Sequence, residues 1–177
     1  MFVARFLTGR TSAQSFDNQF STGRCPRRFY QLSNECVYFA TDGKSYSWRQ
    51  VDRVCSSRIA NLLDEPSASN LEQPNMQPTR GVRQLTLNTP EKTEILRALF
   101  RDYNDQNFGI QLPDDYVTLA RCQDGQDDRW PQFCPNNQYN KSACYETVST
   151  GSNDICLQQV DCRSRYLRAA CEFTLPG

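Results

Sequence analysis

The sequence contains no histidine among its 177 residues. Catalysis by Ser–His or Cys–His pairs, histidine zinc sites and pH switching by histidine are therefore excluded. Cationic and acidic residues balance at 20 each, so no overall field would draw the chain to nucleic acid or to an anionic membrane. No apolar run in the sequence approaches the roughly 20 residues that span a bilayer. The sequence thus predicts no nucleic-acid partner and no membrane span within this chain.

Lysine is scarce, because 17 of the 20 cationic residues are arginine. Residues 1–58 are basic, whereas residues 102–128 hold seven acidic residues and a single arginine. Arg163, Arg165 and Arg168 lie close together near the C-terminus. Arginine favours bidentate contacts and is enriched at protein interfaces. Two interpretations stay open: surface solubility, or an electrostatically complementary interface, for example head-to-tail between copies.

Cysteine is abundant, with nine residues and no C-x-x-C pair among them. Zinc-ribbon and thioredoxin-like motifs therefore have no local support. A disulfide framework is the better interpretation, and it places the domain outside the cytosol. Because nine is odd, at least one thiol is free or is bonded to another chain.

The hydrophobic pattern predicts two helices between short strands. Ser47 and Gln50 form a capping box that begins a helix from about 47 to 60, with Cys55 on its buried face. Thr89-Pro90-Glu91 begins a second helix that ends near residue 103. This order indicates an α+β fold with mostly antiparallel strands. The strands are expected within residues 29–40, 85–87, 116–120, 144–148 and 166–173, and the loops at 64–80 and 123–142.

Several short motifs resemble the C-type lectin-like domain. Cys25-Pro-Arg-Arg-Phe-Tyr with Cys36-Val-Tyr-Phe is similar to the N-terminal hairpin of that family, and Ser47-Trp48 followed by Cys55 to its first helix. Val160-Asp-Cys162 and Tyr166-Leu-Arg-Ala-Ala-Cys171-Glu-Phe resemble its last two cysteines and its closing strand. The resemblance covers about 25–173. It implies the C-type lectin-like fold over 25–177, with two helices packed on small antiparallel sheets and a long, disulfide-stapled loop region. Residues 1–24 would be an N-terminal extension or linker.

The family's disulfide pairing, carried over to this sequence, gives Cys25–Cys36, Cys55–Cys171 and Cys144–Cys162. The common family pattern has no counterpart for Cys122, Cys134 and Cys156. Two of these three are expected to pair and to staple the long loop. The pair Cys134–Cys156 is favoured because both residues flank the predicted loop tip, which leaves Cys122 as a free or intermolecular thiol. The pair Cys122–Cys134 is the alternative.

The same resemblance bears on calcium, which requires about six to eight oxygen ligands, several of them carboxylates. In that family they come from a Glu-Pro-Asn-type and a Trp-Asn-Asp-type motif. Cys134-Pro135-Asn136 and Leu157-Gln158-Gln159 stand at these places, so a thiol and amides replace the carboxylates. We therefore expect a calcium-independent domain without a cofactor. Two alternatives stay open: a shifted register that uses Ser152-Asn153-Asp154, and an ion held by the acidic loop of Asp124, Asp127 and Asp128.

The partner-binding surface is expected in the long-loop region, about 104–160. Trp130 and Phe133 are large aromatic residues in a polar loop, so they are either part of the core or binding anchors. Asn140-Lys141-Ser142 is a glycosylation sequon and predicts a glycan on Asn140 in an exported protein. The residues expected to contact a partner are Arg129, Trp130, Gln132, Phe133, Asn137 and Tyr139.

These features predict a non-enzymatic, extracellular, protein-binding module of a cell-surface receptor or a matrix protein. The adjacent aspartates at 114–115 and 127–128 are not the separated carboxylate pair that glycoside hydrolysis needs. The first seven residues are too short for a secretory signal and are interrupted by Arg5, so we expect a fragment of a larger extracellular protein. The partner would be a protein, with a second copy of the chain or a glycan as alternatives. Two other functions stay open: a carbohydrate-binding lectin with a displaced calcium or sugar site, and a structural subunit of an extracellular polymer.

Overall fold

The computed structural model describes residues 25–26, 28–59, 81–102, 107–120, 128–151 and 154–175. The predicted arm (1–24), the predicted loop at 64–80, Cys122, Asp124 and Asp127 lie outside the described residues. The elements in chain order are β1 (Tyr30–Leu32), β2 (Glu35–Phe39), β3 (Tyr46–Ser47), α1 (Trp48–Val54), the π-helical turn η2 (Cys55–Ile59), β4 (Arg83–Gln84), α2 (Pro90–Asp102), β5 (Phe108–Ile110), α3 (Tyr116–Ala120), β6 (Gln132–Phe133), β7 (Cys144–Ser149), β8 (Ile155–Val160) and β9 (Arg165–Thr174).

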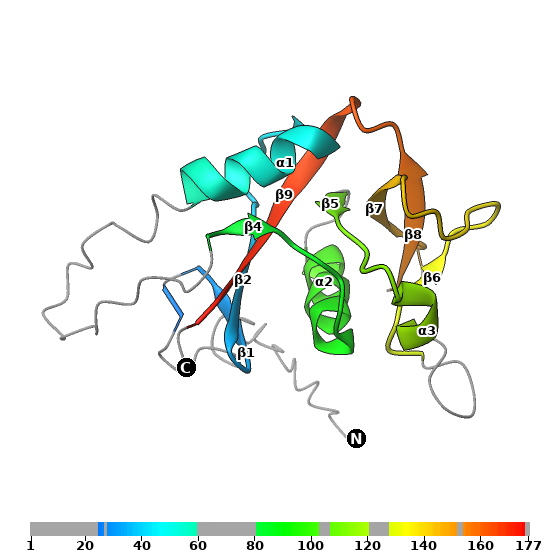
Figure 1. Ribbon diagram of the computed structural model, residues 1–177, viewed down its shortest axis with the longest axis horizontal. Coiled ribbons are helices and arrows are strands. Elements are labelled where there is room, and N and C mark those ends of the chain that lie inside the picture. The colour runs from blue at the N-terminus through cyan, green and yellow to red at the C-terminus, as the bar shows by residue number, and fades with distance from the viewer. Residues whose placement is uncertain are drawn as a thin grey trace, which may run out of the picture.

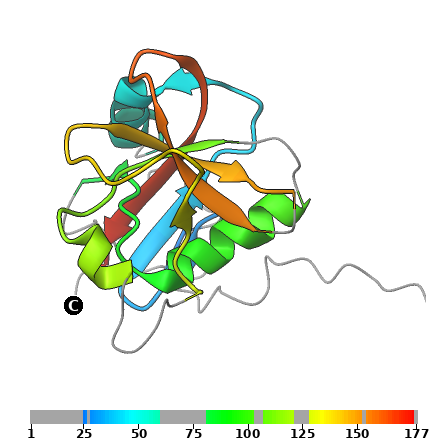
Figure 2. The ribbon, with the colours of Figure 1, turned by 90° about the vertical axis from the view of Figure 1, so that its right-hand side faces the viewer.

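Strand β9 is the centre of the sheet (Figures 1 and 2). It pairs antiparallel with β2, β3 and β4, and parallel with β5. The remaining strands extend from β5 in the order β7, β8, β6, while β1 lies beyond β2 at the other edge. The predicted α+β class is confirmed. The expectation of mostly antiparallel strands also holds, with the β5–β9 and β6–β8 pairs as parallel exceptions.

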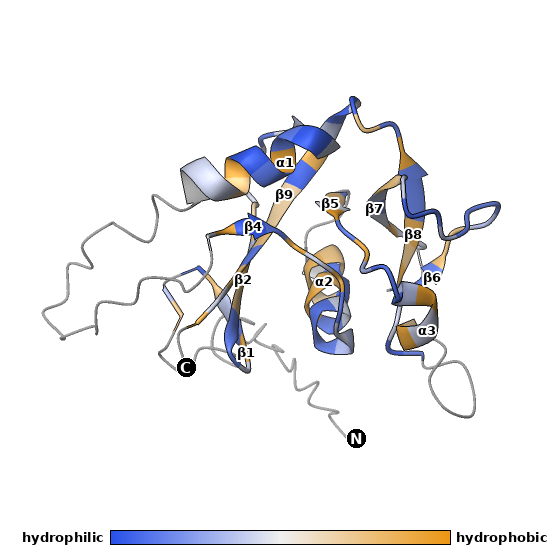
Figure 3. Cartoon of the chain, in the orientation of Figure 1, coloured by the Kyte–Doolittle hydropathy of each residue, from blue (hydrophilic) through white to orange (hydrophobic). Residues whose placement is uncertain are grey.

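The two long helices contribute to separate hydrophobic cores on the two faces of β9. Side chains alternate between the faces of a strand, so Ala169 and Cys171 enter one cluster with Val51 of α1, whereas Ala170 enters another with Leu96 of α2. We call these clusters the α1 core and the α2 core. The start of β9 is exposed at residues 165–166 and hydrophilic in Figure 3, whereas residues 169–173 are buried.

Helix α1 begins where the capping box predicts. The Ser47 N–H donates to Gln50 Oε1 at 3.0 Å, and Cys55, at the start of η2, is 0 % exposed. Helix α2 begins at Pro90 and ends at Asp102, within one residue of the prediction. Among the described helices, none combines the length and the apolar character needed to cross a membrane.

Four disulfides connect the elements, and all four predicted pairs are present. Cys25–Cys36 closes the N-terminal hairpin, Cys55–Cys171 ties η2 to β9, and Cys144–Cys162 links the start of β7 to the turn after β8. The favoured pair Cys134–Cys156 is confirmed, so the alternative Cys122–Cys134 is excluded. Because Cys162 pairs with Cys144, the shifted register, in which Cys156 would take the place of Cys162, is wrong.

A buried ammonium joins α2 to the sheet. Lys92 is 0 % exposed, and its Nζ lies 2.6 Å from Glu172 Oε2 on β9 and 2.9 Å from Glu35 Oε2 on β2. The same Nζ donates to Asn88 Oδ1 at 2.7 Å and to the Thr86 carbonyl at 3.1 Å. The other oxygen of Glu172 accepts from Arg83. Both charges of the buried pair are thus balanced and hydrogen-bonded, as burial of charge requires.

Two sequence-based expectations for local structure are wrong, and strand β8 is among the elements that the sequence did not predict. Residues 116–120 form helix α3 instead of a strand: β propensity favoured a strand, but a turn at Pro113–Asp115 starts a helix, in which Thr118 N–H and Leu119 N–H donate to the Asp115 carbonyl. The strand expected at 85–87 lies at Arg83–Gln84, because β9 pairs there. Strand β8 was not predicted, because Gln158 and Gln159 break its alternating pattern.

Candidate functional site

The long loop between α3 and β7 rests on buried aromatic side chains. Trp130 is 4 % exposed and meets Tyr116 of α3 edge to face, with 5.6 Å between ring centroids. The Tyr116 hydroxyl donates to the Pro131 carbonyl at 2.8 Å. Burial raises the pKa of Tyr116 far above its ordinary value, so the hydroxyl stays a neutral donor. The start of the described loop is therefore held to α3 by both packing and a hydrogen bond.

Arg97 of α2 clamps the same loop from the other side. Its Nη1 and Nη2 donate to the carbonyls of Arg129 and Asp128 at 3.1 and 2.7 Å, and its Nε donates to Asp154 Oδ1 at 2.7 Å. Burial alone would raise the pKa of Asp154, but hydrogen bonds from Arg97 and from the Ile155 N–H outweigh it and hold the pKa below its usual value. One guanidinium thus joins α2, the loop and the start of β8.

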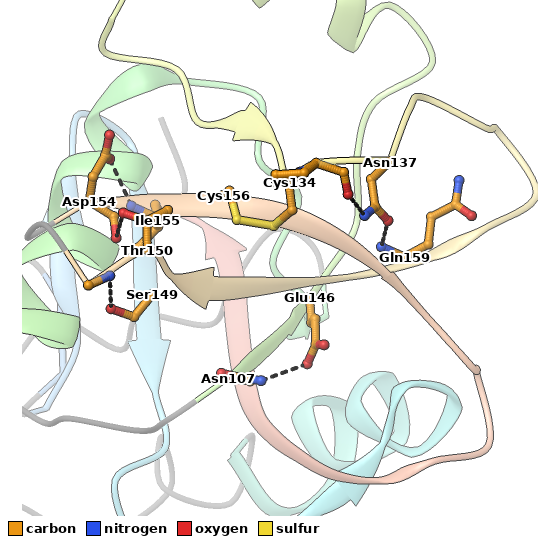
Figure 4. The surroundings of a disulfide bond; sticks show 12 residues. Asn107, Cys134, Asn137, Glu146, Ser149, Thr150, Asp154, Ile155, Cys156 and Gln159 are labelled. Carbon is orange, nitrogen blue, oxygen red and sulfur yellow. Dashed lines mark hydrogen bonds between the residues drawn. A yellow bond between two sulfur atoms is a disulfide. The ribbon is translucent and has the colours of Figure 1, made fainter.

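A disulfide then fastens the loop to β8 (Figure 4). Cys134 follows β6, and its bond to Cys156 spans 5.0 Å between Cα atoms. The Cys134 N–H also donates to the Leu157 carbonyl at 2.9 Å. Gln132 pairs with Cys156 in the parallel β6–β8 register, so Gln132 and Gln158 lie on one face of these strands, on the same side as Cys156.

Amide groups dominate the surface beside this disulfide. Asn137 Oδ1 accepts from the Gln159 N–H at 2.8 Å, and Gln159 Nε2 donates to the Gln138 carbonyl at 3.0 Å. These bonds fix the loop backbone against β8 (Figure 4). Gln132, Asn136 and Gln158 are exposed, and Gln132 Nε2 donates to the Trp130 carbonyl at 3.5 Å. We call these three residues the loop face.

The residues at this place do not fit a calcium ion. Cys134 is consumed by its disulfide, Gln158 and Gln159 are neutral, and Asp154 is engaged by Arg97. Within the described residues, no group of three or more His, Cys, Asp or Glu side chains is placed to hold a metal. Calcium prefers clustered carboxylates, so the described part of the loop region offers no such set. Of the predicted acidic loop, only Asp128 is described, and its side chain is exposed.

The predicted partner-binding residues divide into two groups. Trp130 is buried and Phe133 is half-buried, with its ring 5.8 Å from that of Tyr116. Their side chains therefore contribute to the α2 core, the first of the two placements that the sequence allowed. Tyr139 is half-buried and packs on the same core. The remaining three are exposed or half-buried at the surface: Arg129, Gln132 and Asn137.

Asn140, the predicted glycosylation site, lies on an exposed turn. Its Oδ1 accepts from the Ser142 N–H at 3.0 Å, and its own N–H donates to the Tyr145 hydroxyl at 2.6 Å. The sequon is therefore on the surface, as the sequence suggested. Its glycosylation stays a prediction.

Two polar residues that organise this region, Arg97 and Glu146, were not predicted from the sequence. Arg97 stands beside the apolar stripe of α2 and resembles any surface arginine of a helix. Glu146 is 2 % exposed on β7 and accepts a hydrogen bond from Asn107 at 3.0 Å (Figure 4). It also accepts one from the Tyr166 hydroxyl at 2.9 Å. A charged residue in an otherwise apolar strand, Cys-Tyr-Glu-Thr-Val, was the one available signal.

Replacing Glu146 with glutamine should flatten the pH dependence of stability. Burial raises the pKa of Glu146, and the hydrogen bonds from Tyr166 and Asn107 offset only part of the rise. The folded state then binds this proton more tightly than the unfolded chain, whose glutamate pKa is about 4.3. The resulting stabilisation is full below that unfolded pKa and is lost as the pH rises through the folded pKa. Urea unfolding from pH 4 to 7 measures this decline, which Glu146→Gln should reduce.

The matched control for this measurement is Glu94→Gln, which changes an exposed carboxyl on α2. It should leave the wild-type pH dependence in place. If Glu146→Gln and Glu94→Gln show equal slopes between pH 4 and 7, the buried carboxyl does not contribute the decline.

Comparisons with known proteins give similarity in structure but not in sequence. The chain matches no protein-family model and no curated protein sequence. Among solved structures, it is similar to the C-type lectin domain of murine dendritic cell inhibitory receptor 2 in complex with N-glycan, with 10 % identity, a TM-score of 0.52, and coverage of 85 % of this chain and 98 % of that one. Human lithostathine has 15 % identity, a TM-score of 0.51, and coverage of 91 % and 99 %. The calcium-independent C-type lectin SPL-2 from Saxidomus purpuratus has 14 % identity, a TM-score of 0.51, and coverage of 84 % and 92 %.

Proposed function

Because the chain has the C-type lectin-like fold, we propose that it is a non-enzymatic, calcium-independent module that binds a protein partner outside the cell. The observation that carries this proposal is the loop face. Three exposed amides stand on a backbone held by the Cys134–Cys156 disulfide and the Arg97 hydrogen bonds. A stapled loop loses less conformational entropy when it binds.

The extracellular location rests on the disulfides. The four bonds are typical of an oxidising compartment and are rare in the cytosol. We accordingly propose that the chain belongs to a receptor ectodomain or to a matrix protein. A second candidate function is calcium-independent glycan binding. The exposed amides of the loop face favour it, because an amide can both donate to and accept from a sugar hydroxyl.

Calcium should not change the melting temperature of the protein. A ligand that binds only the folded state at 100 times its dissociation constant would add about 2.7 kcal/mol. The described residues of the loop region include no group of carboxylates placed to hold calcium. Differential scanning fluorimetry with millimolar calcium and with EDTA checks this. A reproducible rise with calcium would contradict the proposal and would point to the acidic loop that includes Asp124, Asp127 and Asp128.

Truncating the loop face should weaken binding to a protein partner by about tenfold. The double variant Gln132→Ala/Gln158→Ala removes two exposed amides, each able to contribute about 0.5–1.5 kcal/mol through a hydrogen bond. The assay is an array of extracellular protein domains probed in EDTA, followed by affinity measurement on each domain bound. The matched control is Glu94→Ala/Arg101→Ala, which truncates two exposed side chains on α2 and should keep wild-type affinity. Melting temperatures of both variants should equal that of the wild type.

The other outcomes of this assay separate the alternatives. Binding to a glycan array but to no protein domain would replace the proposal with the lectin function. Binding that survives the double variant but is lost when residues 1–24 are deleted would move the interface to the N-terminal segment. Mass spectrometry of the non-reduced protein tests the polymer alternative, which requires an intermolecular bond at Cys122.

A further inference from the structure

An arginine-rich surface lies at the opposite end of β8 from the Cys134–Cys156 disulfide. The turn between β8 and β9 carries Arg163, and Arg165 begins β9; both are exposed. Helix α1 starts beside this turn, because the Arg49 N–H donates to the Cys162 carbonyl at 3.4 Å. The exposed Arg49 therefore lies near Arg163. In Figures 1 and 3, the turn meets the first turn of α1, and both are coloured as hydrophilic in Figure 3.

The strand register places Arg165 beside the start of α1. Leu167, Ala169 and Cys171 are buried, and the last two belong to the α1 core. The β3–β9 register shifts between Tyr46 and Ser47, so the alternation of faces along 167–173 does not extend to Arg165. Arg165 pairs with Ser47, two residues before Arg49. We call Arg49, Arg163 and Arg165 the arginine patch, and Arg53 extends it one turn along α1.

Few of the described acidic groups lie near the arginine patch to balance its positive charge. Among the described carboxylates, none lies within 4.0 Å of the guanidinium groups of Arg49, Arg53, Arg163 or Arg165. Asp161 is the nearest acidic residue in the turn, and its Oδ1 accepts from the Arg163 backbone N–H at 2.9 Å. Asp52 of α1 is directed to the backbone of β4, where it accepts from the Gln84 N–H at 3.0 Å. Four cations thus gather in a protein whose net charge is zero.

We propose that the arginine patch binds a sulfated polysaccharide. Guanidinium groups match paired anionic oxygens through two parallel N–H donors. Tyr166, which follows Arg165, is the one large hydrophobic side chain that is exposed among the described residues, at 42 %, and its hydroxyl already donates to Glu146 at 2.9 Å. Closely spaced guanidinium groups match a polyanion that carries repeated sulfate groups.

Heparin is the probe for this site, used with the full-length chain. The variant Arg49→Gln/Arg163→Gln/Arg165→Gln should bind immobilised heparin at least tenfold more weakly than the wild type. The slope of log affinity against log salt concentration should become shallower by about two to three, because each contact with a polyanion releases counterions. The matched control is Arg28→Gln/Arg101→Gln/Lys141→Gln, which removes the same three charges from exposed positions elsewhere. It should stay within twofold of the wild type.

Three results would overturn the inference. The first is unchanged heparin affinity in the patch variant. The second is an equal loss of affinity in both triple variants, which would mean that heparin binding depends only on the net charge of the protein. The third is binding of poly-glutamate as tight as that of heparin, which would replace the polysaccharide with an acidic polypeptide. The loop-face variant Gln132→Ala/Gln158→Ala should keep full heparin affinity, so this inference and the proposed function can fail separately.

Discussion

Replacing Lys92 with methionine should lower the free energy of unfolding by about 3–5 kcal/mol. Lys92 Nζ lies within 2.9 Å of carboxylate oxygens of both Glu172 and Glu35, and the first of these side chains is 1 % exposed. Methionine keeps the length of the aliphatic side chain but leaves the Glu172 carboxylate with Arg83 as its remaining cation. A buried charge that loses its partner is strongly destabilising, because water cannot reach it. Urea unfolding at pH 7 measures the loss.

The double variant Lys92→Met/Glu172→Gln measures the interaction between the two charges, because it removes both of them. Once both charges are removed, no buried charge is left without its partner, so the loss should be smaller than the sum of the two single variants. Lys141→Met is the matched control, since Lys141 pairs with Asp114 while both side chains are more than two-thirds exposed. We expect it to have little effect. A loss after Lys92→Met as small as that of the control would show that the buried pair does not hold α2 on the sheet.

Removing the Cys55–Cys171 disulfide should destabilise the fold by about 4–5 kcal/mol. The two cysteines are separated by 116 residues and are both 0 % exposed. The bond closes a long loop, and the entropy that it removes from the unfolded chain grows with loop length. Guanidinium unfolding of the variant Cys55→Ala/Cys171→Ala measures the effect, and the variant is expected to be largely unfolded at 37 °C.

The variant Cys25→Ala/Cys36→Ala provides the comparison for loop length. This bond spans 11 residues, and the same relation gives a loss of about 3 kcal/mol. The difference between the two double variants should therefore be about 2 kcal/mol. Equal losses would mean that local packing of the sulfur atoms, and not the length of the closed loop, decides how much each bond stabilises the protein.

The two helix starts that were expected from local capping patterns were found in the structure. The capping residues of α1 and α2 lie close in sequence to the turns that they start, so Ser47 and Thr89-Pro90 predicted both helix starts. The apolar and aromatic residues around Cys36 and Cys171 predicted β2 and β9. Short segments with weak or mixed patterns were not predictable in this way. Helix α3 and strand β8 depend on a turn and on neighbouring strands, and both outweighed the propensity of their own residues.

The candidate site was predicted only in part for the same reason. Sequence could place Gln132 and Gln158 in the loop region and could show that amides and a thiol replace the usual carboxylates. It could not show that Trp130 turns inward, because a large aromatic residue in a polar loop fits either a core or a binding role. Nor could it connect Arg97 to Asp154, which lies 57 residues further along the chain.

The sequence by itself determined that the chain carries disulfides and two helices, which follow from residue type and from spacing along the chain. The resemblance to the C-type lectin-like domain implied three of the disulfide pairs and located the motifs where the calcium-binding carboxylates are replaced. Only the tertiary structure decided which polar groups are buried together and that Arg49, Arg163 and Arg165 have no carboxylate within 4.0 Å among the described residues. Lys92 meets Glu172 across 80 residues, and Arg49 reaches the turn of Arg163 through a backbone contact with Cys162. Such contacts depend on how β9 brings distant segments to its two faces, and no local pattern in the chain encodes that arrangement.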